Sequence, residues 1–93
     1  MKIVRTQEYQ SELLLILRYI ANDKVSASKI FRRELNKYIN NIPTFPYKYK
    51  QSIYFNDENV RDMTFKKYTV NYEVDLNDNI IIILSIFNQN KPV

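Results

Sequence analysis

The stretch that decides the fold is 68-YTVNYEVDLNDNIIIILSIF-87. Residues 68–74 alternate between apolar and polar side chains, which predicts a β-strand with one buried face. Residues 75–79 are rich in Asp and Asn, which form turns readily in the absence of glycine. Residues 79–87 then form an apolar run with five Ile, which is typical of a central strand covered on both faces. Together they predict an antiparallel hairpin in the middle of a sheet.

The segment before this hairpin predicts more strand structure, preceded by a loop. Residues 60–65 alternate, with Arg61 on the same face as Met63 and Phe65, and we expect Arg61 to be half-buried and paired with a nearby carboxylate. Residues 52–55 predict a short edge strand. Residues 44–51 form a loop in which aromatic rings alternate with lysines, a mixture that also suits single-stranded nucleic acid.

Two helices are predicted upstream of the loop. Ser26 is a suitable N-cap for the second helix, and Pro43 ends it. Its apolar stripe predicts a core face, whereas the opposite face is basic. That face is either a solvated surface or a contact for an acidic partner, and it carries Lys29, Arg32, Arg33 and Lys37.

The first helix is predicted to follow a short strand at residues 2–5. Thr6 is its N-cap, and the helix runs to about Ala21. Leu14, Leu15 and Tyr19 lie off its main apolar stripe. They are either ordinary core, if the sheet curls around the helix, or an exposed apolar patch for a partner.

The predicted order is therefore β-α-α-β-β-β, in one α+β domain spanning residues 1–93. An N-terminal strand and a helical hairpin pack on a mostly antiparallel sheet of three to four strands. The chain contains no His, Cys or Gly. This composition excludes the usual zinc sites, thiol nucleophiles, Ser-His-Asp triads and glycine-rich phosphate loops. We expect no metal and no cofactor.

The net charge of +4 is unevenly distributed along the chain. Residues 1–50 carry ten Lys or Arg and four Asp or Glu. Residues 51–93 carry four Lys or Arg and six Asp or Glu. A basic half indicates an anionic partner, either nucleic acid or an acidic protein. The longest uncharged apolar runs, 13–17 and 80–87, are far shorter than the roughly 18 residues of a membrane span. The sequence thus predicts a soluble cytoplasmic protein with no membrane partner.

In this order and spacing, the motifs resemble the RelE/ParE superfamily of toxins from bacterial toxin–antitoxin modules. They are a basic helical hairpin, the Pro46 loop, and Arg61 seven residues before a strand with Tyr68 and Tyr72. The run Ile-Ile-Leu-Ser-Ile at 82–86 and a short polar tail at 87–92 follow. The resemblance covers nearly the whole chain and implies an acidic antitoxin as partner, with operator DNA bound only through that antitoxin.

The superfamily implies two kinds of target, because RelE-like members cut mRNA on the ribosome and ParE-like members inhibit DNA gyrase. The ribonuclease pattern has loop lysines, matched here by Lys48 and Lys50. Its strand Arg falls at Thr69 and its later Arg at about Gln89, so both are missing. The carboxyl-terminal Tyr or His has no counterpart either. The resemblance therefore favours a gyrase-directed toxin that is not an enzyme.

Two alternatives remain open: an mRNA interferase with a non-standard basic site, and a non-toxic module that binds antitoxin and DNA. If the chain is a ribonuclease, its candidate catalytic residues are Lys48, Lys50, Arg61 and Lys91. The predicted target or nucleic-acid surface comprises Tyr47, Lys48, Tyr49, Lys50, Arg61, Gln89 and Lys91. The predicted antitoxin surface comprises Leu14, Leu15, Tyr19, Lys29, Arg32, Arg33 and Lys37.

Overall fold

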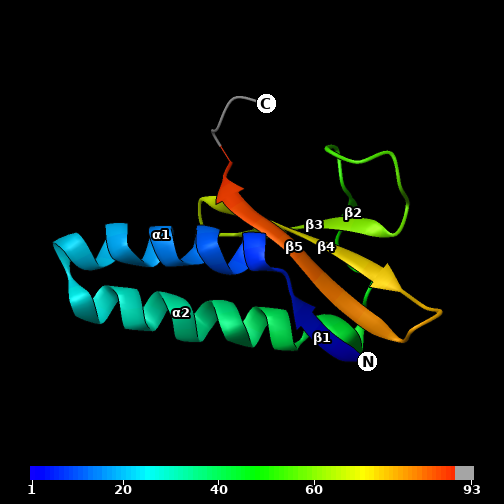
Figure 1. Cartoon of the computed structure of the whole chain (residues 1–93), viewed down its shortest axis with the longest axis horizontal. Helices are drawn as coiled ribbons and strands as arrows, with labels where there is room; N and C mark the ends of the chain where they lie inside the picture. Colours follow the sequence, from blue (N-terminus) through cyan, green and yellow to red (C-terminus); the bar gives the residue numbers. More distant parts are fainter. Residues whose placement is uncertain (90–93) are drawn as a thin grey trace.

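The computed structural model describes residues 1–89 and contains two helices and five strands (Figure 1). This order confirms the predicted α+β fold. The elements, in chain order, are β1 (Lys2–Arg5), α1 (Gln7–Asp23), α2 (Val25–Asn40), the 3-10 turn η1 (Ile42–Thr44), β2 (Lys50–Gln51), β3 (Val60–Phe65), β4 (Tyr68–Asp75) and β5 (Ile80–Asn88).

The five strands form one sheet in the order β1-β5-β4-β3-β2. β1 runs parallel to β5, and every other neighbouring pair is antiparallel. The predicted central hairpin is confirmed, because β4 and β5 pair along their whole length. Their register shifts between Asn71 and Tyr72, and a bulge of this kind increases the local twist of a sheet.

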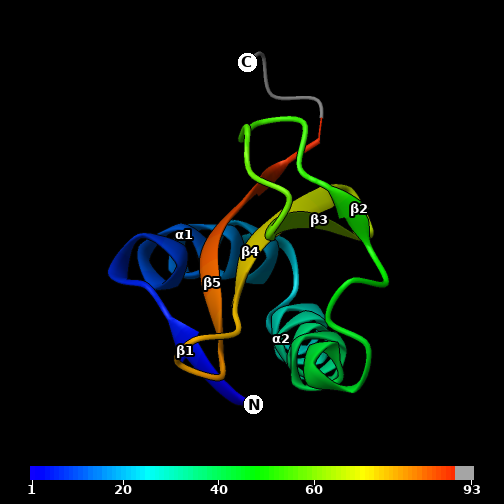
Figure 2. The same cartoon turned by 90° about the vertical axis from the view of Figure 1, so that its right-hand side faces the viewer.

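The two helices lie against different parts of the sheet (Figure 2). α2 packs under the core face, where the ring of Phe31 meets those of Phe65 and Tyr68 edge to face. α1 runs along the edge of β5 beyond the end of β1. The Thr6 hydroxyl donates to the Leu84 carbonyl at 2.8 Å, and the Ile86 N–H donates to Glu12 Oε1 at 3.1 Å. The side chains of Glu12 in α1 and of its N-cap Thr6 thus satisfy backbone groups of β5 that a further strand would otherwise pair.

One of the two predicted helix caps is correct. Thr6 caps α1, since its hydroxyl accepts from the Tyr9 N–H at 3.1 Å. The prediction for Ser26 is wrong: α2 begins at Val25, and the single extended residue Lys24 links it to α1. The Ser28 hydroxyl near the start of α2 instead donates to the Leu17 carbonyl of α1 at 2.9 Å and so connects the two helices.

The predicted edge strand at residues 52–55 is also wrong, because the edge strand β2 is Lys50–Gln51. The Ser52 hydroxyl accepts from the Tyr54 N–H at 3.1 Å, and this local turn competes with strand pairing. The chain from Ser52 to Asn59 therefore leaves the sheet as an arched loop (Figure 2).

The off-stripe residues of α1 are exposed and do not join the core. The exposed fractions are 48% for Leu14, 65% for Leu15 and 71% for Tyr19. The sheet does not curl around α1 to cover them, so the ordinary-core interpretation of these three residues is wrong. None of the helices within residues 1–89 is long and apolar enough to span a membrane.

Candidate functional site

A groove on the sheet face opposite α2 gathers several of the predicted target residues. We call it the sheet groove. It has a volume of about 520 Å³. The loop before β2, the strands β2, β3 and β4, and the turn after β5 all contribute to it. Its polar lining includes Lys48, Lys50, Asp62, Thr64, Thr69 and Gln89.

The structure brings Lys48, Tyr49, Lys50 and Gln89 into the sheet groove together, although they are up to 41 residues apart in the sequence. Gln89 is held there by its N–H, which donates to the Lys67 carbonyl at 2.8 Å. Thr69, the other position where the ribonuclease pattern has an arginine, also lines the groove. Lys91 lies outside the described residues. Four positions to which the resemblance assigns the ribonuclease pattern thus lie together here, with Thr and Gln in two of them.

Arg61 and Tyr47 are not part of the groove lining. The half-buried Arg61 guanidinium donates to the carbonyls of Glu58 and Tyr49, and it lies 4.9 Å from the centre of the Tyr47 ring. The expected pairing of Arg61 with a carboxylate is therefore wrong, because main-chain carbonyls are its hydrogen-bond acceptors. Arg61 anchors the lysine-bearing loop to β3.

Tyr72 provides a second anchor for the same loop. Its hydroxyl donates to the Pro46 carbonyl, and its ring meets the ring of Tyr49 edge to face. Burial raises the pKa of Tyr72 well above its usual value, so the hydroxyl remains a donor across the physiological range. Arg61 and Tyr72 therefore hold the backbone of the loop that carries Lys48 and Lys50.

A polar ladder of three side chains fixes the strands under the groove. Asn71, which is 2% exposed, donates to Asp62 Oδ1 and accepts from the Ser85 hydroxyl, both at 2.5 Å. The other carboxylate oxygen of Asp62 accepts from the Ile53 N–H at 3.3 Å and so holds the arched loop. This ladder joins β3, β4, β5 and the loop into one rigid wall.

Replacing Asn71 by Ala is expected to lower the free energy of unfolding by about 2 kcal/mol, because it leaves the partly buried Asp62 and Ser85 without their partner. Chemical denaturation of the purified variant measures this value. Thr64→Ala is the matched control on the same face, since Thr64 is exposed. Equal stabilities of the two variants would show that the ladder does not hold the wall together.

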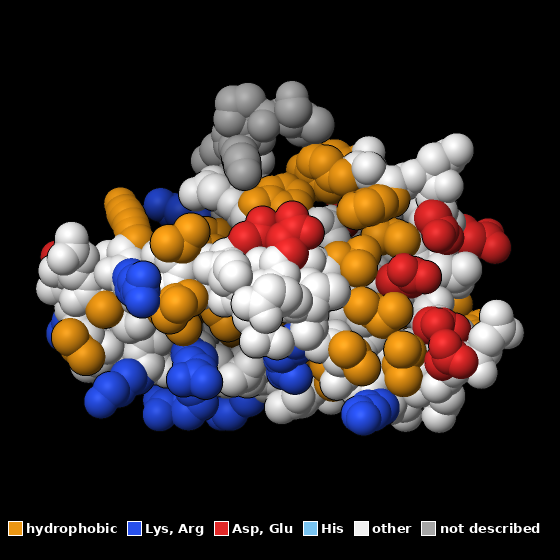
Figure 3. All heavy atoms as spheres, in the orientation of Figure 1, with side chains coloured by type: hydrophobic (Ala, Val, Ile, Leu, Met, Phe, Trp, Pro, Cys, Tyr) orange, Lys and Arg blue, Asp and Glu red, His pale blue; other side chains and the backbone are white. Residues whose placement is uncertain are grey.

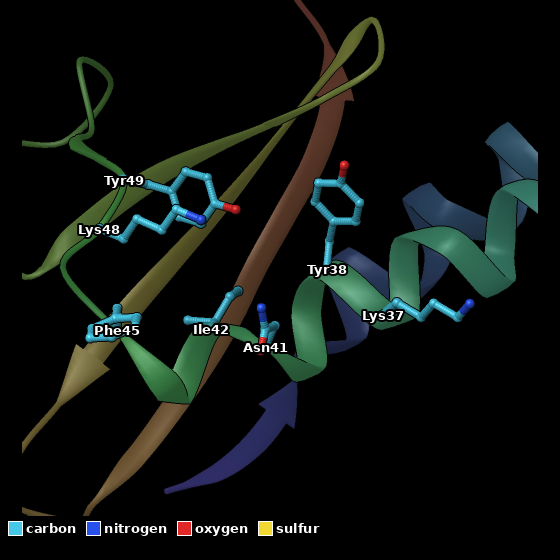
Figure 4. A pocket seen from close by; sticks show the side chains of 7 residues that line it. All are labelled: Lys37, Tyr38, Asn41, Ile42, Phe45, Lys48 and Tyr49. Carbon is cyan, nitrogen blue, oxygen red and sulfur yellow. The ribbon is translucent and has the colours of Figure 1, made fainter.

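A second hollow of about 330 Å³ adjoins the sheet groove and shares Lys48 and Tyr49 with it. In Figure 4 the rings of Tyr38 and Tyr49 stand on opposite sides of this hollow, and Lys37 points away along α2. The Lys48 ammonium lies 5.5 Å from the centre of the Tyr49 ring. The loop therefore places the Lys48 ammonium and the Tyr49 ring at the boundary between the two hollows.

Several groove residues were not predicted as site residues. Asp62 and Thr64 alternate with Met63, and this period of two already places them on the face away from the core. Tyr54 also lines the groove, and its ring meets Phe87 edge to face at 5.0 Å. No pattern in the sequence indicates that contact, because it depends on how the arched loop folds back over the sheet.

The predicted antitoxin residues do not form one surface. Leu15 and Tyr19 line a large groove between α1 and the end of β5, which we call the edge groove. Leu14 faces a different groove, between α1 and α2. The four basic residues of α2 line a shallow hollow on its outer face. In Figure 3, blue side chains gather over α2 and red ones over the far end of the sheet.

The chemistry available in the sheet groove is that of an anion-binding surface. Lys48 and Lys50 are exposed, and Asp62 is the acidic residue in the lining. Within residues 1–89, the structure gathers no set of three or more acidic side chains that could hold a metal ion. The groove combines two exposed cations with rings and amides, and these groups can bind a partner without supplying a strong general base.

The β-strand, the helical hairpin and the mostly antiparallel sheet form the α+β fold of the ParE-like class of small proteins. The model of the family described as ParE toxin of type II toxin–antitoxin system, parDE, matches residues 3–92. The chain therefore belongs to the ParE toxin family. It is a toxin of a type II toxin–antitoxin system.

Among solved structures, the chain is similar to one from the chromosomal ParDE toxin–antitoxin system of P. aeruginosa. The TM-score is 0.74 at 14% sequence identity, and the alignment covers 95% of each chain. At this identity the similarity shows a shared fold. The search of curated proteins finds no match.

Proposed function

We propose that this toxin inhibits growth by binding DNA gyrase through the sheet groove and the loop that carries Lys48 and Lys50. The observation that carries this proposal is the set of residues that line the groove. It keeps the two loop lysines of the superfamily but has Thr69 and Gln89 where a ribonuclease would have arginines. Membership of the ParE family points to the same target.

Cleavage of mRNA requires stabilisation of a highly charged transition state and groups that move protons to and from the reacting oxygens. Arg61 cannot supply that charge in its observed position, because its guanidinium is bound to main-chain carbonyls. Two exposed lysines beside the acidic Asp62 provide less electrostatic stabilisation than such a transition state requires. The groove is therefore better suited to binding a partner than to cutting a phosphodiester.

Expression of the chain without any antitoxin tests this proposal in cells. We expect growth arrest, loss of negative supercoiling in a reporter plasmid, and messenger RNA whose ends match those of uninduced cells. New cuts at codon boundaries in translated messages would instead establish the mRNA interferase. Normal growth at high expression would establish the non-toxic module.

We further propose that a cognate acidic antitoxin in the same cytoplasm neutralises the toxin by laying an amphipathic helix in the edge groove. The groove has a volume of about 880 Å³ and is lined by Leu15, Ile16, Tyr19 and Ile20. These residues are spaced for a helix-in-groove contact, and Tyr19 is 71% exposed. Operator DNA would be bound only through the antitoxin.

Replacing Tyr19 by Ala is expected to weaken antitoxin binding about tenfold, because an exposed aromatic anchor at an interface contributes about 1–2 kcal/mol. Calorimetric titration with the acidic protein encoded beside the toxin gene measures this effect. Leu76→Ala is the control, since Leu76 is 67% exposed but lies in the turn between β4 and β5. Equal losses of antitoxin affinity in the two variants would show that the antitoxin does not bind in the edge groove.

A further inference from the structure

The smaller hollow of about 330 Å³, between the end of α2 and the loop before β2, is bounded by aromatic rings. We call it the tyrosine hollow. Tyr38 and Tyr49 stand on opposite sides of it, and the Tyr49 hydroxyl points across it toward Tyr38 (Figure 4). The buried side chain of Ile42 also lines it, as does Phe45, which is 70% exposed. The hollow is therefore a slot with apolar, ring-bearing walls.

The two facing rings are each held in place by a ring of the core. The Tyr38 ring meets that of Phe65 at a centroid distance of 5.1 Å, and the Tyr49 ring meets that of Tyr72 at 6.4 Å, both edge to face. Tyr38 is nevertheless 49% exposed, and Tyr49 is half-buried. Rings that are fixed before binding lose little conformational freedom when a ligand stacks on them. The pair therefore suits a flat aromatic group.

The charged groups of the tyrosine hollow are cationic. The Lys48 ammonium lies 5.5 Å from the centre of the Tyr49 ring. Lys37, in the last turn of α2, lines the same hollow, although its ammonium points away along the helix in Figure 4. No Asp or Glu of the described residues lines the hollow, and within residues 1–89 neither lysine forms an ion pair. A ligand that matches this lining carries a negative charge beside its aromatic ring.

Asn41 adds a directional contact to the tyrosine hollow. Its side-chain oxygen accepts from the Thr44 hydroxyl at 3.3 Å. In Figure 4 the amide nitrogen points the other way, toward the space between the two tyrosines, and it can donate there. The edges of nucleobases carry nitrogen and oxygen acceptors, whereas the edge of a phenyl ring carries none. The amide therefore favours a nucleobase over other flat aromatic groups.

We propose that the tyrosine hollow binds one nucleotide, with its base between Tyr38 and Tyr49 and its phosphate beside Lys48. The Asn41 amide donates to an acceptor on the edge of the base, and Lys37 raises the positive potential around the phosphate. The volume is near the lower end of the range of about 300–1,000 Å³ for small-molecule sites, which suits a single nucleotide. A free nucleotide and the terminal nucleotide of a strand present this same chemistry.

The test titrates adenosine monophosphate, adenosine and inorganic phosphate separately into the full chain labelled with ¹⁵N. We expect the nucleotide to give saturable amide shifts at Tyr38, Asn41 and Lys48, with a dissociation constant of about 1 mM or lower. Adenosine and phosphate should each bind about tenfold more weakly, since each lacks one half of the contacts. Equal binding of nucleotide and phosphate, or no saturation at about 10 mM nucleotide, would overturn the inference.

Variants of the chain assign the base and the phosphate separately. Tyr38→Ala is expected to weaken nucleotide binding about tenfold, whereas Tyr38→Phe keeps the ring and should bind normally. Tyr19→Ala is the matched control, because Tyr19 is a more exposed tyrosine on the other helix and lies outside the hollow. Equal nucleotide binding by the two alanine variants would contradict stacking on Tyr38.

Lys48→Gln changes an exposed side chain and should leave the fold intact. It is expected to weaken binding of adenosine monophosphate about fivefold, because one charge contact is worth about 1 kcal/mol, and to leave adenosine binding unchanged. Equal losses for the two ligands would show that the phosphate does not lie beside Lys48.

A short 5′-phosphorylated oligoadenylate distinguishes the two sources of the nucleotide. Tighter binding than adenosine monophosphate, with added shifts at Lys50 and Thr69 in the adjoining sheet groove, would assign the hollow to the end of a strand. Equal or weaker binding would assign it to the free nucleotide. All these measurements use the chain alone, without gyrase or antitoxin, so failure here and failure of the proposed function are distinguishable.

Discussion

Replacing Phe31 by Ala is expected to lower the free energy of unfolding by about 3–5 kcal/mol, a large part of the stability of a domain this small. Phe31 is 4% exposed, and its ring meets both Phe65 and Tyr68 edge to face at centroid distances of 5.2 and 5.5 Å. It is thus the main aromatic contact between α2 and the β3–β4 hairpin. Urea denaturation followed by circular dichroism measures the loss.

The matched control is Phe45→Ala, which removes the same atoms from a side chain that is 70% exposed. We expect this variant to lose less than about 1 kcal/mol, as is usual for surface positions. Comparable losses of unfolding free energy from the two substitutions would contradict the packing of α2, because the loss would then not depend on burial of the side chain.

Reversing the charge of both groove lysines, with Lys48→Glu and Lys50→Glu, is expected to weaken target binding at least about 100-fold. Two exposed charges 4 Å apart interact by about 1 kcal/mol in water, and reversing one turns attraction into repulsion. Both side chains are exposed, so the fold should be retained. Gyrase inhibition by the purified variant measures the effect.

A variant with Lys2→Glu and Lys24→Glu has the same net charge and serves as the control. Both lysines are exposed and lie away from the sheet groove, in β1 and in the link between the helices. This control should inhibit as the parent chain does. Equal losses in the two double variants would mean that overall charge, and not the groove, governs binding.

Much of the fold could be predicted from the sequence because its strongest signals are local. The alternation in residues 68–74 and the apolar run after it defined the β4–β5 hairpin. Asn79 adopts a positive φ of 56°, as expected of Asn in a chain without glycine. The turn at Lys66 was not indicated, since its φ of 55° is unusual for lysine. Tertiary pairing of β3 with β4 imposes it.

The candidate site was predictable only where a family pattern supplied positions. Lys48, Lys50 and Gln89, which the family pattern supplied as candidate target residues, lie together in the sheet groove. The role of Arg61 was not predictable, because its acceptors are carbonyls that reach it only after the loop folds back.

The most direct test of the proposed function is a supercoiling assay with purified DNA gyrase, relaxed plasmid and the chain alone. The proposed function predicts that micromolar toxin inhibits supercoiling, and that the Lys48→Glu, Lys50→Glu variant at the same concentration does not. Full gyrase activity in the presence of micromolar folded toxin would contradict the proposed target.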